Sequence, residues 1–143
     1  MDGVEQRLKH ARHIFAEAPF IAELGYDLVR IEPGFAETRL AVEPRHCQHH
    51  GFVHAGVQAT MADHSAGCAA TTLLALDQIV LTAEFKINLL RPAIGEALVC
   101  RARVLKPGRT LFVAEADVYA LRDGTESHVS RTMVTLSVVA ERA

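Results

Sequence analysis

Asp63 is the leading candidate for chemistry, because the stretch that contains it, residues 55–76, is apolar and almost free of charge. The length and composition of this stretch predict a helix. Asp63 follows Ala55 and Gly56 by eight and seven residues, two turns that place it on the face of the helix start. The first N–H groups of a helix lack internal partners and carry the positive end of its dipole. A carbonyl oxygen bound there, with a carboxylate near its carbon, suits acyl transfer or hydrolysis in one cleft.

Two simpler interpretations of these positions stay open. A buried carboxylate is costly unless it is paired. If Asp63 has no role in acyl transfer or hydrolysis, we expect it to pair with a buried arginine or to face solvent. His54 directly precedes the helix, and its position alone favours an ordinary role at the helix cap over catalysis. His46, His49 and His50 cluster on a polar segment but lack the helical spacing of a metal-binding motif, so we expect a solvated loop and no metal.

The remaining elements predict an α+β fold. Helical spacing with interspersed charges indicates a short amphipathic helix over residues 3–17, which ends at or just before Pro19. Alternating apolar and polar residues bounded by turn signals predict antiparallel strands at 26–32, 35–42, 79–90, 96–105, 110–121 and 128–140. Such a sheet buries one face by curving around the long helix at about 55–76. Its free edges favour pairing with a second copy of the chain.

Composition narrows the class of protein. The chain has 143 residues, half of them hydrophobic and 22% charged, which predicts one folded domain spanning 1–143. A net charge of −2 argues against a nucleic-acid module, since these show a basic excess. Three cysteines without paired spacing indicate a reducing compartment. With neither a signal peptide nor an apolar run of membrane length, we expect a cytoplasmic protein.

The motif around the helix start resembles that of the hotdog-fold acyl-CoA thioesterases. The pattern Gln48-x-x-Gly51-x-x-His54-Ala55-Gly56, with Asp63 nine residues after the histidine, is similar to the PaaI-like and Arthrobacter-type hydroxybenzoyl-CoA thioesterase branch. The segment LTAEFKINLLRPAIGEALVCRARVLKPGRT resembles the strand, turn and strand that follow in that family. The resemblance covers about residues 20–140.

The resemblance implies roles for individual residues. Asp63 would be the catalytic general base or nucleophile, and the N–H of Ala55 would bind the thioester oxygen. His54 and Gln48 would hold the thioester or the attacking water. Thr82 aligns with a serine or threonine that reaches the site of the other subunit. Where the family has the first glycine of His-Gly-Gly this chain has Ala55, which keeps the N–H and adds a methyl group near the site.

The same resemblance implies which residues bind the substrate. Gly56 is expected to contact the substrate beside Ala55, and Arg91, Lys106 and Arg109 are candidates for the phosphates of coenzyme A. The implied reaction converts an acyl-CoA and water into a free acid and CoA without a cofactor, in a homodimer or a dimer of dimers. The acyl group is expected to be a small aryl, short or medium-chain group.

Two other functions compete with hydrolysis. Hydratases and dehydratases of acyl thioesters share the fold but resemble motifs with a different histidine-to-carboxylate order or spacing, which this chain lacks. A non-catalytic acyl-CoA sensor is the alternative from another class. Release of free thiol from acyl-CoA distinguishes an enzyme from a sensor.

Overall fold

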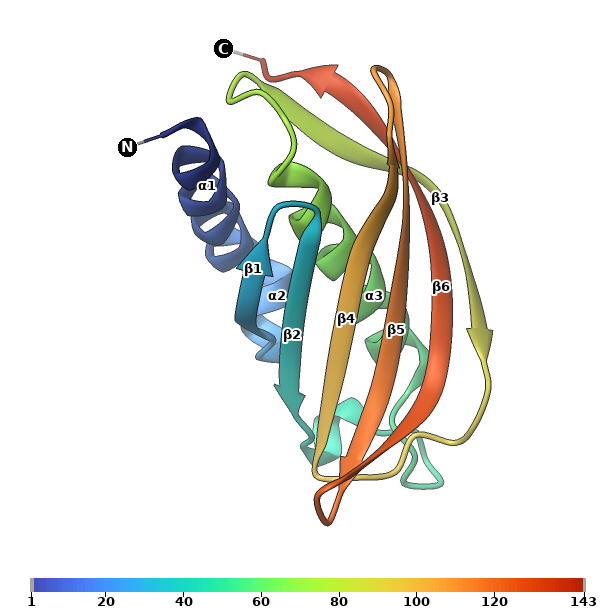
Figure 1. Cartoon of the computed structure of the whole chain (residues 1–143). Coiled ribbons are helices and arrows are strands. Elements are labelled where there is room, and N and C mark those ends of the chain that lie inside the picture. The colour runs from blue at the N-terminus through green and yellow to red at the C-terminus, as the bar shows by residue number, and fades with distance from the viewer. Residues whose placement is uncertain (1, 143) are drawn as a thin grey trace.

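The computed structural model describes residues 2–142 and consists of one curved antiparallel sheet with a long helix on its concave side (Figure 1). The strand order is β1-β2-β4-β5-β6-β3. The six strands are β1 (Asp27–Glu32), β2 (Phe35–Ala41), β3 (Gln78–Leu89), β4 (Ala97–Pro107), β5 (Leu111–Arg122) and β6 (Thr125–Ala140). The helices are α1 (Gly3–Glu17), α2 (Pro19–Leu24), the 3-10 turn η1 (Pro44–His46) and α3 (Ala55–Thr71).

Small side chains let α3 pack closely against the sheet. Ala62, Ala66 and Ala69 on the helix have no exposed surface, and neither do Ala102 and Ala116 on β4 and β5. Because these side chains are small, the backbone of α3 lies close to the strands that curve around it. The predicted α+β architecture, a hotdog arrangement of sheet and central helix, is confirmed.

The end of the central helix differs from the prediction of about residue 76, because α3 stops at Thr71. The hydroxyl of Thr72 donates to the carbonyl of Ala69 at 2.6 Å and accepts from the N–H of Gly34 at 2.7 Å. The chain leaves the helix through a turn at Thr72 and Leu73, and the next residue, Leu74, is buried in the core. The sequence after Thr71 remains apolar and gives no sign of the helix end, because Thr72 is held by a hydrogen bond from Gly34 in a turn that is distant in the sequence.

A short helix, α2, was not anticipated. The N-terminal helix ends at Glu17 as predicted, but Pro19 then occupies the first turn of α2, where its missing N–H costs nothing. Gly25 ends α2 at φ +92°, a conformation that glycine adopts freely, and its N–H donates to the carbonyl of Ile21. The predicted strands agree with the observed ones to within one residue at all but two termini: β4 ends two residues later, at Pro107, and β6 begins three residues earlier, at Thr125.

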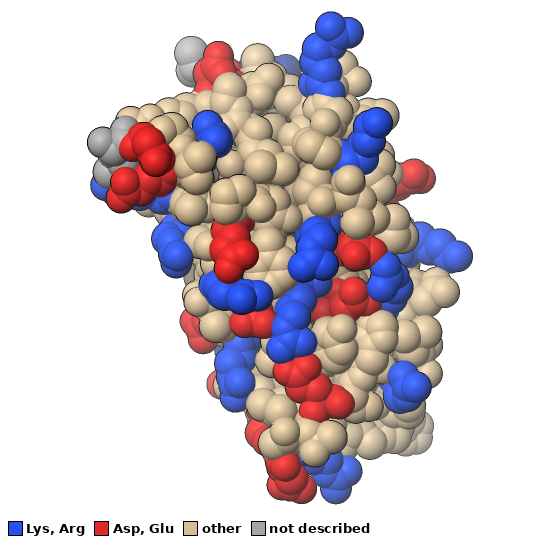
Figure 2. All heavy atoms as spheres, in the orientation of Figure 1, with Lys and Arg blue, Asp and Glu red and all other residues tan. Residues whose placement is uncertain are grey.

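Acidic and basic side chains alternate over the face of the sheet that points away from α3 (Figure 2). Arg101 forms ion pairs with Glu37 and Glu126 at 2.6 and 2.7 Å, and Arg131 pairs with Glu115 and Asp117. These pairs leave no large patch of one sign on the face shown. Within residues 2–142, none of the helices has the length and apolar character needed to cross a membrane.

Candidate active site

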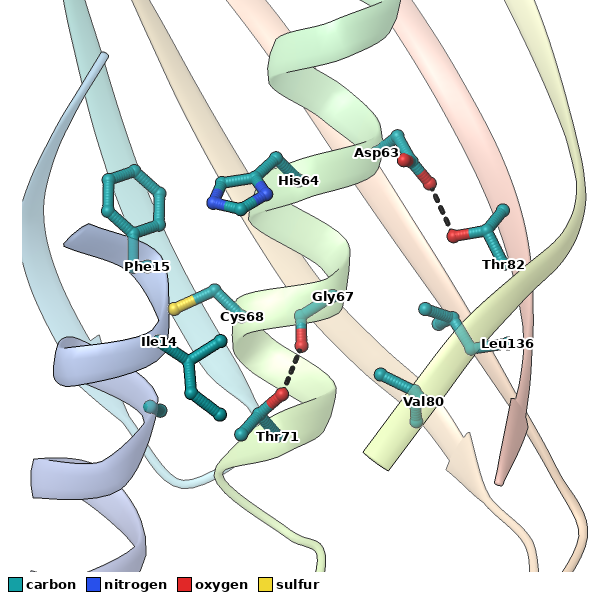
Figure 3. Close-up of a pocket in the computed structure, with 11 residues that line it drawn as sticks. Ile14, Phe15, Asp63, His64, Gly67, Cys68, Thr71, Val80, Thr82 and Leu136 are labelled. Carbon is teal, nitrogen blue, oxygen red and sulfur yellow. Dashed lines mark hydrogen bonds between the residues drawn. The ribbon is translucent and has the colours of Figure 1, made fainter. Parts of the chain in front are cut away.

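Asp63 and Thr82 form the polar centre of the candidate site. Asp63 lies in the middle of α3, and Thr82 lies on the neighbouring edge strand β3. The Thr82 hydroxyl donates a hydrogen bond of 2.7 Å to Oδ1 of Asp63 (Figure 3). The register of β3 against β6 shifts between Thr82 and Glu84. Such a bulge re-aims side chains, and here it leaves Thr82 facing the helix opposite the buried Leu136.

The environment of Asp63 disagrees with both simpler interpretations of this residue. None of the ion pairs formed among residues 2–142 includes Asp63, so it has no arginine partner. Its side chain is half-buried rather than fully solvated, and it contacts a hydroxyl. A carboxylate that is oriented by one donor and otherwise free to meet a ligand is equipped to act as a base or a nucleophile.

A cavity of about 220 Å³ opens beside this pair, between α1, α3 and β3 (Figure 3). We call it the Asp63 cavity; besides Asp63 and Thr82 its lining consists of Ala11, Ile14, Phe15, His64, Gly67, Cys68, Thr71, Val80 and Leu136. Burial raises the pKa of the Cys68 thiol to about 12, although Arg12 acts to lower it. Cys68 is therefore a protonated apolar wall rather than a competing nucleophile.

His64 forms another part of this wall. Its ring lies 4.6 Å from that of Phe15, measured between centroids. Burial lowers the pKa of His64 below its ordinary value, and this effect outweighs the Phe15 backbone and the charge of Asp63, which both raise it. The imidazole is therefore neutral at pH 7, and the cavity holds no fixed positive charge.

The start of α3 carries the second set of candidate groups. His54 is the N-cap of the helix, and its Nδ1 accepts a 2.8 Å hydrogen bond from the N–H of Gly56. A β-carbon at Gly56 would lie only 3.0 Å from that nitrogen, so a side chain there would crowd the histidine of the cap. The N–H of Gly56 is thus occupied, whereas the exposed Ala55 has an N–H with no partner among residues 2–142. Ala55 therefore supplies the free donor.

A second hollow of about 440 Å³ surrounds this helix start. We call it the helix-start hollow; it is lined by Gln48, Phe52, Val53, His54, Ala55, Gln58, Leu89, Leu90, Arg91, Pro92 and Ala93. Gln48 uses its Oε1 to accept from the N–H of His50, which fixes the loop before the helix. The structure thus brings Gln48, His54 and Ala55 together, as the family resemblance implies.

The Asp63 cavity and the helix-start hollow share no lining residue. Ala55 and Asp63 are eight residues apart, which is about 12 Å along the helix axis. An oxyanion donor and an attacking group must each lie within about 3–3.5 Å of the same carbonyl group. The expectation that both face one cleft is therefore wrong for a single chain, because a shared helix face does not shorten this axial distance.

The other expected substrate contacts lie at two ends of the sheet. Arg91 follows β3, borders the helix-start hollow and donates to the carbonyl of His128 at 2.8 Å. Lys106 and Arg109 lie where β4 turns into β5, beside the end of β6 near Val138. One chain does not bring the three together. Thr82 contacts Asp63 of its own chain, so this pairing needs no second subunit.

The histidine-rich loop has a structural role that composition did not indicate for all its members. His46 is buried; its Nδ1 accepts from the N–H of Glu43 at 2.9 Å, and its Nε2 lies 2.8 Å from the carbonyl of Leu24. His49 and His50 are the polar, outward members of the loop. No group of three potential metal ligands lies together in residues 2–142.

Sequence reasoning missed most of the cavity wall. Gly67 follows Asp63 by four residues, so helical spacing could have identified it as a neighbour; Cys68, one residue further on, does not follow from that spacing. Phe15 belongs to α1, far away in the sequence, and only the packing of α1 on α3 reveals it.

Comparison with known proteins agrees with this geometry, because the model of the thioesterase superfamily matches residues 50–127, more than half of the chain. The chain belongs to the thioesterase superfamily. A solved thioesterase family protein from Silicibacter pomeroyi is 40% identical, with a TM-score of 0.90 over 96% of this chain and 99% of that one.

More distant relatives support the same assignment. The 1,4-dihydroxy-2-naphthoyl-CoA hydrolase of Listeria monocytogenes is 27% identical over 119 residues, which are 83% of this chain and 94% of that protein. The PaaI protein of Escherichia coli, from the phenylacetic acid degradation operon, has a TM-score of 0.84 at 17% identity over 97% of this chain and 98% of its own, a likeness of fold. This superfamily member is a thioester hydrolase of the hotdog fold.

Proposed function

We propose that this thioesterase hydrolyses acyl-CoA to a free acid and CoA, with Asp63 as the general base or nucleophile. The observation that carries the proposal is the Asp63 carboxylate, oriented by Thr82 at 2.7 Å and bordering a cavity. As base, Asp63 takes a proton from water while the water oxygen bonds to the thioester carbon. The carbon–sulfur bond then breaks, and the CoA sulfur leaves with the electron pair and receives the proton.

The Asp63 cavity is our candidate for the acyl group. Its volume of about 220 Å³ compares with the roughly 150 Å³ of an engineered protein cavity that holds benzene, so it has room for one aromatic ring or a short to medium alkyl chain. Ile14, Phe15, Val80 and Leu136 supply apolar contacts. The relative from Listeria, named for an aromatic acyl-CoA, supports an aryl group.

A second copy of the chain completes the site in this proposal. Phe85 and Leu89 of β3 stand opposite the buried Val134 and Ser130, so they face the helix side of the sheet. They are nevertheless 44% and 52% exposed, since they border open hollows beside the first half of α3. A partner that pairs with the β3 edge covers this surface and brings its own helix start toward Asp63. The assembly unit is then a dimer, and pairs of dimers remain compatible with it.

Positive charge near the helix start supports binding of the CoA moiety. Arg91 borders the helix-start hollow, and we propose that it contacts a phosphate there. Lys106 and Arg109 lie at the other end of the chain's sheet, so they contribute only if the partner presents them. His54 and Gln48 hold the helix-start loop in the shape that presents the Ala55 N–H.

A panel of acyl-CoA substrates tests the proposed reaction. Free thiol is measured with a thiol reagent for benzoyl, phenylacetyl, butyryl, octanoyl and palmitoyl esters of CoA. We expect turnover of the first four and little of the last, whose chain exceeds the cavity. Saturable binding of every ester with no thiol release would identify a sensor and refute hydrolysis.

Mixing two inactive variants tests whether the site spans two chains. Asp63→Asn keeps the helix start, and Ala55→Pro keeps Asp63. In a two-fold dimer each mixed dimer has one site with both native groups, so statistical mixing restores about a quarter of parental activity. No recovery after subunit exchange, shown by a tagged chain, would contradict the shared site.

A further inference from the structure

Gln58 is a buried polar residue that the mechanism above does not use. It lies in the first full turn of α3, and only 3% of its surface is exposed. Its Oε1 is enclosed by protein and has no hydrogen-bond partner among residues 2–142. Gln58 also lines the helix-start hollow, together with His54 and Ala55. The chain therefore maintains an unsatisfied amide beside the one free N–H of the helix start.

This arrangement is costly for stability alone. A buried amide without a partner loses its bonds to water and receives nothing in return. The hollow that Gln58 lines contains both apolar and polar residues, but none of them forms a hydrogen bond with its Oε1. Native proteins satisfy the great majority of buried polar groups, so an amide left without partners beside a ligand-sized hollow indicates a role in binding. A thioester oxygen is an acceptor and cannot satisfy Oε1, so that role falls to the NH₂ group, the end of the amide that is not enclosed.

The helix geometry directs this amide toward the free N–H of Ala55. Gln58 follows Ala55 by three residues, so both lie on one face of α3. Side chains on a helix point back toward its N-terminus, which brings the amide of Gln58 over the turn that begins at Ala55. Because Oε1 is the enclosed end of the amide, its NH₂ group is the polar end that remains for a ligand.

We propose that the Gln58 amide donates a second hydrogen bond to the thioester oxygen, alongside the N–H of Ala55. This role rests on the proposed acyl-CoA hydrolysis and adds a catalytic residue to it. The thioester oxygen gains negative charge as the carbon is attacked, so a preorganised donor binds the transition state more strongly than the substrate. Because the amide is neutral, it adds no negative charge that would cancel the positive end of the helix dipole at this position.

Replacing Gln58 with Met tests the proposal, since Met has a similar length and donates no hydrogen bond. We expect kcat to fall by about 10²- to 10³-fold, the range of one oxyanion donor, with KM changed less than about threefold. We expect the melting temperature to stay equal or to rise, because an unsatisfied polar group has been removed. A loss of activity without a loss of stability is not what a purely structural residue shows.

Two further variants sharpen the comparison. Gln58→Glu keeps the shape and the acceptors but removes the NH₂ donor, and we expect at least the same loss in kcat above pH 7. Thr132→Val is the matched control: Thr132 is also fully buried with an unpartnered hydroxyl, but it does not line the hollow. It should leave kcat unchanged. Should Gln58→Met fail to fold, Gln58→Asn, which shortens the amide, replaces it.

The outcomes separate this inference from the proposed function. If the parent releases thiol and folded Gln58→Met matches its kcat, Gln58 is not a donor and the inference is overturned while hydrolysis stands. If the parent releases no thiol from any ester, hydrolysis fails. Gln58 is then judged by the affinity for a CoA ketone analogue, in which a methylene separates sulfur from the carbonyl. Affinity at least threefold weaker in Gln58→Met than in the parent supports the contact with the oxygen, and a smaller change overturns it.

Discussion

Thr82 donates its hydroxyl proton to Asp63 across 2.7 Å, from an edge strand to the central helix of the same chain. The contact fixes one carboxylate oxygen and leaves the other for water or substrate. The same hydrogen bond connects the Asp63 carboxylate to β3, the edge strand that we expect to pair with a second copy of the chain. Assembly and the orientation of the carboxylate are therefore linked through one residue.

Replacing Thr82 with Val removes this hydrogen bond while keeping the branched shape. One hydrogen bond contributes about 0.5–1.5 kcal/mol, so kcat should fall by up to roughly tenfold and the fold should persist. Thr82→Ser, which keeps the hydroxyl, is the matched control and should retain most activity. Steady-state kinetics on the best ester of the panel measures both. Equal kcat for the valine variant and the parent would show that Asp63 needs no orientation by Thr82.

Replacing Asp63 with Asn keeps the size of the side chain and removes its capacity to take a proton or attack carbon. General-base and nucleophilic roles contribute at least about a hundredfold, so kcat should fall by that factor or more. The amide still accepts from Thr82, and the circular dichroism spectrum should match that of the parent. A folded variant with near-parental turnover would exclude Asp63 from the reaction.

The fold could be predicted from sequence because each element carries its own signal. Alternation marks the strands, and the uncharged stretch after His54 marks the buried helix. The end of α3 and the existence of α2 depend instead on tertiary bonds. Thr72 stops the helix by bonding Gly34, 38 residues away, and Pro19 starts a helix where the sequence indicated only a stop.

The candidate site was predicted in parts rather than as an arrangement. Helical spacing identified Asp63 and the free N–H of Ala55, but it describes the direction of a side chain and not its distance along the axis. The separation of the two hollows therefore emerged only from the structure. Gln58 carried no signal, since a glutamine in an apolar helix becomes unusual only when its amide is shown to lack a partner.

The buried His64 predicts a dependence of stability on pH. Its folded-state pKa lies below the value of the unfolded chain, chiefly because burial disfavours the charged form. As the pH falls below about 6.5, the unfolded chain binds a proton that the folded chain does not, so the free energy of unfolding decreases. The group does not weaken the fold above that pH.

Urea unfolding at pH 7.5 and pH 5.5 measures this effect in the parent and in His64→Gln, whose amide does not titrate. We expect the variant to lose less stability than the parent between the two pH values. His13→Gln is the control, because His13 is exposed on α1 and only meets Glu17 at 3.2 Å. An identical pH dependence in the parent and His64→Gln would contradict the assignment.

Changes at Ala55 separate its N–H from its side chain. Ala55→Gly keeps the N–H and removes the methyl group, so we expect activity to persist, bulkier acyl groups to be accepted and stability to fall by up to about 1 kcal/mol. Ala55→Pro removes the N–H at the first helical position, which tolerates proline. His54 precedes it with ψ 138°, an extended conformation that a following proline allows, so the variant should fold.

The proline variant should lose roughly 2.7–4 kcal/mol of transition-state stabilisation, the scale of one oxyanion donor, which corresponds to about a 10²- to 10³-fold drop in kcat. The positive end of the helix dipole remains, so substrate binding should change less than turnover. Parallel measurement of kcat and KM for the glycine and proline variants decides the matter. A folded proline variant that turns over like the parent would show that the thioester oxygen binds elsewhere, and the Gln58 amide would then have no backbone donor to act beside.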